Sequence, residues 1–233
     1  MSESLLYYLA YGSNLHPVRL RERVPSAELV DVVELKHYRL TFQKRGQDGS
    51  SKCNLARTGE ASDGVYGAIY QIDSTHKPIL DRFEGNGYHD SQLTVEFHGQ
   101  EYSCLTYLAR PSYIENSLKP FHWYKELIVL GARHLRFPHA YVRFIESIES
   151  VKDPDEERQI HNQRLIDRIL QYSTLKPQDI PKRVRGIFGR GLHGILNHST
   201  AWDLWWLWPL PISSPLFLDR RLPSGSLIGR SLS

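Results

Sequence analysis

The order of patterns along this chain constrains its fold most. Apolar or alternating runs typical of β-strands fill residues 5–109, whereas apolar residues at helical spacing follow Pro120. The predicted strands are 5–11, 29–35, 38–43, 52–56, 64–72, 91–97 and 101–109. Because strands come first and helices later, we predict an α+β fold with a closed or strongly curved sheet.

Helices are predicted at five places. A short one fits residues 16–23, and a second begins after the capping pair Asp73-Ser74 and ends at Glu84, before a glycine-rich stop. Beyond Pro120, one helix carries Trp123, Leu127 and Leu130 on a shared face, a second is opened by Pro138, and a charged third runs from Asp153 to about Tyr172.

Composition places the chain among soluble globular proteins. The net charge of +3 comes from the end of the chain, since seven Lys or Arg and two Asp follow Pro181. The rest therefore gives no sign of a nucleic-acid groove. No signal-peptide pattern and no apolar stretch long enough to cross a bilayer is present, so we expect a cytoplasmic protein without membrane contact. The scattered His and the separated Cys53 and Cys104 predict neither a metal site nor a disulfide framework.

We predict three regions along the chain. Residues 1–150 form the main domain, 151–181 a charged helix beside it, and 182–233 an irregular tail that contains four of the five Trp. The tail has no clear period, and we expect it to be poorly ordered. Docking on the body or a partner, and sequence without a selected fold, are the alternatives.

The segment Tyr11-Gly12-Ser13-Asn14-Leu15 follows the first apolar strand. Glycine permits a positive φ or a close backbone approach there. Consecutive N–H groups of Gly12, Ser13 and Asn14 would then point into one concavity, which suits an anion or a carbonyl oxygen. The plain alternative is a strand-to-helix turn with a capping side chain.

Glu84 is the second candidate. It ends a predicted helix, where the negative end of the helix dipole should raise the pKa of its carboxyl group. A raised pKa suits general acid–base chemistry near neutral pH. The plain alternative is a surface glutamate before a glycine cap.

These two segments, in this order, resemble the γ-glutamylcyclotransferase family. The resemblance begins at Tyr11–Leu15 and spans about residues 5–150. It continues through the segments Pro25-Ser26-Ala27, Tyr38–Phe42, Val65–Tyr70, Leu80–Gly85, Cys104–Leu108 and Tyr124–Ala132. The paired motifs are specific, although either alone would be weak.

The resemblance implies a small mixed β-barrel flanked by helices, with the active site at one mouth. It implies cyclisation of a γ-glutamyl-amino acid to 5-oxoproline with release of the amino acid, without a cofactor or metal. Glu84 would be the acid–base and residues 11–15 a backbone cradle, so that Ser13 is not a nucleophile. Three tyrosines would line the pocket or belong to the core, namely Tyr88, Tyr107 and Tyr124.

Two other functions stay open. A related cyclotransferase would act on a γ-glutamyl-amine, glutathione or a biosynthetic γ-glutamyl intermediate. A binding domain would keep the fold without turnover, although Glu84 argues against it. The expected partner is a small-molecule γ-glutamyl substrate, and a homodimer is compatible with the sequence.

Overall fold

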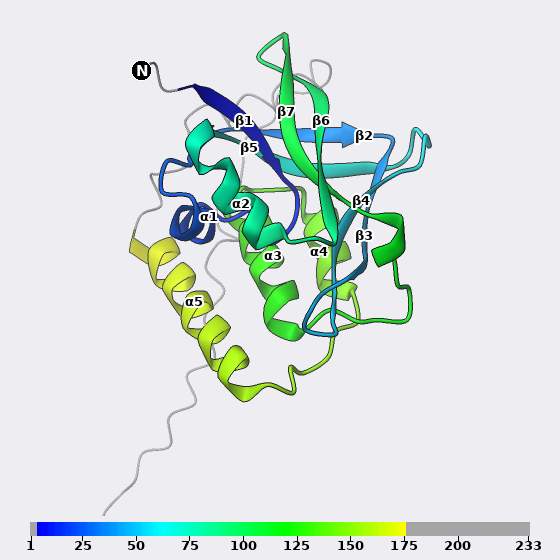
Figure 1. Ribbon diagram of the computed structural model, residues 1–233, viewed down its shortest axis with the longest axis vertical. Coiled ribbons are helices and arrows are strands. Elements are labelled where there is room, and N and C mark those ends of the chain that lie inside the picture. The colour runs from blue at the N-terminus through cyan, green and yellow to red at the C-terminus, as the bar shows by residue number, and fades with distance from the viewer. Residues whose placement is uncertain (1–3, 176–233) are drawn as a thin grey trace, which may run out of the picture. The chain divides into compact units, whose positions relative to one another are not determined.

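A computed structural model describes residues 4–175, and Figure 1 shows their arrangement. The predicted irregular tail, 182–233, lies outside the described residues, as does the end of the predicted 151–181 region. No helix within residues 4–175 has the length and apolar character needed to cross a membrane.

The main sheet has five strands in the order β2-β5-β1-β7-β6. β1 lies in the centre, antiparallel to β5 and parallel to β7, so the sheet is mixed. The predicted interior strand 64–72 is β5, which pairs with β1 on one side and β2 on the other. The strands are β1 (Leu5–Ala10), β2 (Glu28–Lys36), β5 (Gly64–Asp73), β6 (Tyr88–Phe97) and β7 (Gln100–Ala109).

The main sheet is strongly curved. Its edge strands are β2 and β6, which would lie roughly 19 Å apart if five strands formed a flat sheet. His98, directly after β6, nevertheless lies 3.0 Å from Asp31 of β2. The α+β class is therefore confirmed. Strand pairing among residues 4–175 closes no barrel, because β3 (Tyr38–Arg45) and β4 (Ser51–Arg57) pair with each other as a separate antiparallel hairpin.

Five α-helices accompany the strands in residues 4–175. They are α1 (Pro17–Arg23), α2 (Lys77–Glu84), α3 (His122–His134), α4 (His139–Ser147) and α5 (Glu156–Leu175). Short 3₁₀ turns precede α2 (Ser74–His76) and follow β7 (Pro111–Tyr113). Asp73 caps the first of these turns, as its capping pattern predicted, by accepting the Thr75 N–H at 2.8 Å.

Helix α3 holds the chain that leaves β1. A Cβ placed on Gly131 would lie only 2.5 Å from Leu15 Cβ, so glycine is what lets α3 approach this segment so closely. Helix α5 contacts α1 and α3 and buries Leu165, Ile166 and Ile169. Figure 1 shows α1, α3 and α5 grouped beneath the sheet. The segment that follows β1 therefore packs directly against α3.

Candidate functional site

Two cavities meet at Glu84. The inner cavity is small, about 30 Å³, and the outer pocket is larger, about 320 Å³. Four residues line both: Ser13, Glu84, Tyr88 and Tyr124. A ligand that occupies both cavities would therefore lie beside Glu84, among these shared residues. Within the described part of the chain, no group of three or more His, Cys, Asp or Glu side chains could hold a metal ion.

The segment 11–15 forms a tight turn at the inner cavity, closed by a hydrogen bond from Leu15 N–H to the Gly12 carbonyl at 3.1 Å. A Cβ on Gly12 would lie 3.3 Å from Cys53 Cβ, whereas Gly12 has no positive φ. Glycine was expected here for a positive φ or for a close backbone approach, and the structure shows the close approach, to Cys53 of β4. Gly12, Ser13 and Asn14 donate no backbone hydrogen bond to any residue among 4–175, so their N–H groups are available to a ligand.

Leu15 has a different position from its four neighbours. Its side chain is fully buried against α3, and it lines neither cavity. Its carbonyl accepts a hydrogen bond from the Tyr70 hydroxyl at 2.7 Å. Leu15 therefore anchors the loop in the core and has no place on the cavity surface.

Glu84 is the last residue of α2, and Gly85 ends the helix with φ 69°. The Asn14 side-chain amide donates to Glu84 Oε1 at 2.9 Å, which joins the two predicted motifs directly. Arg23 in turn donates to Asn14 Oδ1 at 3.0 Å and holds that amide in one orientation. The carboxyl group is thus fixed at the boundary of the cavities.

The pKa of Glu84 is raised above the ordinary carboxyl value, mainly because burial removes the charged form from water. Arg23, Lys44 and Arg19 oppose this shift, as does the hydrogen bond from Asn14. The direction agrees with the sequence-based expectation, but the main cause is desolvation, not the helix dipole. A raised pKa favours a carboxyl group that accepts a proton and returns it.

The inner cavity is walled by tyrosines whose hydroxyl groups mostly bond the protein. Tyr11 donates to the Tyr107 carbonyl, and Tyr88 donates to the Cys53 carbonyl. Tyr107 donates to Asp81 at 2.6 Å, and Tyr124 accepts the Cys53 N–H at 3.1 Å. The three predicted tyrosines, Tyr88, Tyr107 and Tyr124, therefore line the cavity and are also buried in the core. Burial raises the pKa of all of these hydroxyl groups, which stay protonated.

Sequence reasoning missed Tyr8. It lines the inner cavity, and its hydroxyl oxygen accepts from Asn14 at 3.1 Å. No group among residues 4–175 accepts the Tyr8 hydroxyl proton, so Tyr8 has a donor available for a ligand. Its place two residues before the end of β1 was the only available signal.

Sequence reasoning also missed the cationic lining of the outer pocket, which consists of Arg19, Arg23, Lys44, Lys52 and Arg82. Arg19 and Arg23 are four residues apart on α1 and therefore share a helix face. Lys44 and Lys52 are directly opposite in the β3–β4 hairpin. The four-residue spacing of the two arginines could have been recognised in the sequence. The pairing of the two lysines could not, because it depends on the register of the hairpin.

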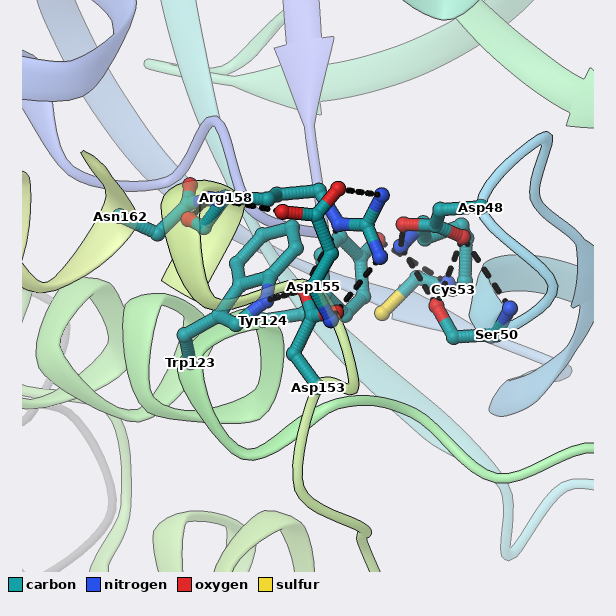
Figure 2. Close-up of polar contacts among 10 residues, drawn as sticks. Asp48, Ser50, Cys53, Trp123, Tyr124, Asp153, Asp155, Arg158 and Asn162 are labelled. Carbon is teal, nitrogen blue, oxygen red and sulfur yellow. Dashed lines mark hydrogen bonds and ion pairs between the residues drawn. The ribbon is translucent and has the colours of Figure 1, made fainter. Parts of the chain in front are cut away.

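Figure 2 shows a network of polar contacts around Trp123, which lines the outer pocket. Trp123 Nε1 donates to Asp153 at 2.8 Å, and Arg158 Nε donates to the same carboxylate at 2.7 Å. The Lys52 ammonium lies 5.0 Å from the Trp123 ring centre and 2.6 Å from Asp48 Oδ2. Trp123 is thus bonded to Asp153, which Arg158 of α5 also binds, and the Lys52 ammonium lies over its ring.

Comparison with known proteins gives concordant results. Residues 64–145, which include Glu84, match the model of the AIG2-like family. The chain is 32% identical over 154 residues to the γ-glutamylcyclotransferase of Bos taurus and 30% identical over 160 residues to that of Homo sapiens. Each of these alignments covers 63% of this chain and 80% of the relative.

Two solved structures have the same fold. A γ-glutamyl cyclotransferase superposes with a TM-score of 0.61 at 25% identity, covering 71% of this chain and 99% of the other. A crystal structure of an uncharacterized protein from Homo sapiens gives 0.60 at 26% identity with the same coverage. On the strength of these matches and of the paired motifs at one site, the chain belongs to the γ-glutamylcyclotransferase family.

Proposed function

We propose that this chain is a cyclotransferase that converts a γ-glutamyl-amino acid to 5-oxoproline and a free amino acid. The observation that carries the proposal is the Asn14–Glu84 hydrogen bond. It joins a carboxyl group of raised pKa to a loop whose three N–H groups donate no backbone hydrogen bond to residues 4–175. An acid–base and an anion cradle are the two groups that this reaction needs.

The proposed reaction is an intramolecular acyl transfer. The substrate's own α-amino nitrogen attacks its γ-carbonyl carbon, so a ring C–N bond forms and the original amide C–N bond breaks. Glu84 as carboxylate takes a proton from the attacking amine and then gives a proton to the departing amine. Atoms and protons balance without water, and no side chain serves as a nucleophile.

In this proposal the loop 11–15 binds the negatively charged groups of the substrate. The N–H groups of Gly12, Ser13 and Asn14 suit the α-carboxylate of the γ-glutamyl group or the oxyanion that develops on its γ-carbonyl. The Tyr8 hydroxyl adds a further donor at the same cavity. Donors fixed before the substrate arrives need no reorganisation as charge develops.

The narrow inner cavity adds an orientation effect. A free γ-glutamyl chain rotates about several single bonds, and only folded conformers bring its amine to its γ-carbonyl. A cavity walled by buried tyrosines restricts those rotations. Holding reacting groups in attack geometry removes a substantial part of a barrier.

The test is release of 5-oxoproline from γ-glutamyl-alanine by the full chain and by Glu84→Gln. We expect turnover by the first and a loss of about 10²- to 10⁴-fold in the second, the usual contribution of an acid–base group. Equal release by both proteins would remove Glu84 from the mechanism. A panel with glutathione and a γ-glutamyl-amine identifies the acceptor, and no release from any compound would contradict the proposed function.

A further inference from the structure

Two cations of the outer pocket have no ion-pair partner in direct contact among residues 4–175. Arg19 and Lys44 are each only 6% exposed, and both line the pocket. Neither side chain forms an ion pair or hydrogen bond with any residue from 4 to 175, and Arg19 Nε is buried without a partner. The Lys44 ammonium instead lies over the Tyr88 ring, 4.4 Å from its centre.

This arrangement is costly without a ligand. Burial lowers the pKa of both side chains, that of Arg19 to about 9, which shows that the site resists the charged forms. Lys44 also lies directly opposite Lys52 in the hairpin, where like charges repel each other. A buried, unpaired cation is normally neutralised or paired. An anionic ligand would supply the missing partner.

The pocket also has a surplus of positive charge. Among residues 4–175, five cationic side chains line it and two acidic ones do. Asp48 is already paired with Lys52 at 2.6 Å, which leaves the Glu84 carboxyl group to face the remaining cations. Glu84 becomes neutral when it accepts the substrate's proton, so it does not balance them throughout the reaction.

We propose that the outer pocket binds the departing amino acid and selects one with an acidic side chain. This inference rests on the proposed function, in which the inner cavity holds the γ-glutamyl group and the scissile amide lies at Glu84. The departing part must then extend past Glu84 into the outer pocket. Its α-carboxylate occupies one unpaired cation, and a side-chain carboxylate occupies the other.

A substrate pair tests this without any mutation. γ-Glutamyl-glutamate and γ-glutamyl-glutamine have nearly the same shape and differ by one carboxylate. We expect kcat/KM to be about 10- to 100-fold higher for the glutamate compound, as for a charge-assisted hydrogen bond, and the difference to lie mainly in KM. Added salt should reduce the ratio.

The outcomes separate the two proposals. Turnover of both compounds and of γ-glutamyl-alanine, with equal efficiency or a preference for glutamine, leaves the proposed function intact and overturns the acidic subsite. No 5-oxoproline from any of the three overturns both.

Variants locate the effect. The variant of Lys44→Gln and Arg19→Gln that removes the partner of the side-chain carboxylate should lower the glutamate-to-glutamine ratio by about tenfold or more. The other variant removes the partner of the α-carboxylate, which all three compounds carry, so it should lower kcat/KM for all of them and keep the ratio. Lys36→Gln is the matched control, because Lys36 is exposed on β2, forms no ion pair with residues 4–175 and lines neither cavity. Its ratio should equal that of the unmodified protein. A full ratio in both pocket variants overturns the assignment, and if either fails to fold, the substrate pair and its salt dependence still decide.

Discussion

The two cavities that meet at Glu84 differ in how their polar groups are satisfied. In the inner cavity almost every side-chain hydroxyl or amide has a protein partner, such as Asn14 between Arg23 and Glu84. In the outer pocket Arg19 and Lys44 have none within the described residues. A satisfied network fixes geometry, whereas unpaired buried cations favour a ligand that pairs them.

This difference predicts different consequences of mutation. Changes at the inner cavity should act on the chemical step for every substrate. Changes at the outer pocket should act on the choice of substrate.

Glu84→Gln should separate activity from stability. Activity should fall by about 10²- to 10⁴-fold. Because the folded protein raises the pKa of Glu84, it disfavours the carboxylate, and the neutral Gln variant should be at least as stable at neutral pH.

The difference in stability between the unmodified protein and Glu84→Gln should depend on pH. Below the ordinary glutamate pKa of about 4.3, both proteins have a neutral side chain and should be equally stable. The unmodified protein should then lose stability relative to the variant as pH rises through the raised pKa. Thermal melts across pH measure this, and a variant less stable at pH 7 would contradict the desolvated carboxylate.

Asn14→Ala should lower kcat by about 10- to 100-fold, because Glu84 loses the amide that orients it. The same hydrogen bond lowers the pKa of Glu84, so its removal should move the acid limb of the kcat/KM profile to higher pH. A purely structural role for Asn14 would reduce activity without moving that limb.

Asp153→Asn should destabilise the fold, because Asp153 accepts a hydrogen bond from Trp123, which lines the outer pocket. Burial alone would raise the pKa of Asp153, but hydrogen bonds from Arg158, Trp123 and the Asp155 N–H lower it to about 2. That shift is worth about 2–3 kcal/mol at pH 7 and is lost as pH falls below about 4 towards 2. Melting temperature should drop by roughly 5–10 °C at pH 7. Equal melting at pH 7 would show that the network carries no stability.

Ser13→Ala should have the smallest effect, a few-fold in kcat/KM. Ser13 contributes its backbone N–H, which the substitution keeps, and its hydroxyl bonds no residue among 4–175. Steady-state kinetics measure the loss. A fall of 10⁴-fold or more would indicate a nucleophilic serine and would contradict the proposed route.

The sequence predicted the inner cavity far better than the outer one. Tyr11–Asn14 and Glu84 were recognised because a strand end, a helix end and their order form a family motif. Leu15 was included with that motif, but the structure buries it beneath the loop. A five-residue motif does not show which of its side chains faces the ligand.

The outer pocket depends on contacts between distant elements. Lys44 lies in a strand of mixed burial, and nothing local shows that its side chain turns inward over Tyr88. Trp123 was placed on a helix face, but its partner Asp153 lies thirty residues further on. Such pairings follow from hairpin register and helix packing, which periodicity does not encode. The curvature of the sheet was predicted, but the separate β3–β4 hairpin was not.

One experiment tests the division between the cavities most directly: kcat/KM for γ-glutamyl-glutamate and γ-glutamyl-glutamine, measured in the unmodified protein, Glu84→Gln, Lys44→Gln and Arg19→Gln. We predict that Glu84→Gln lowers both values by the same large factor and keeps their ratio. One of Lys44→Gln and Arg19→Gln should instead lower the ratio by about tenfold or more. A ratio that changes in Glu84→Gln, or that stays fixed in both Lys44→Gln and Arg19→Gln, would contradict the separation of chemistry from acceptor choice.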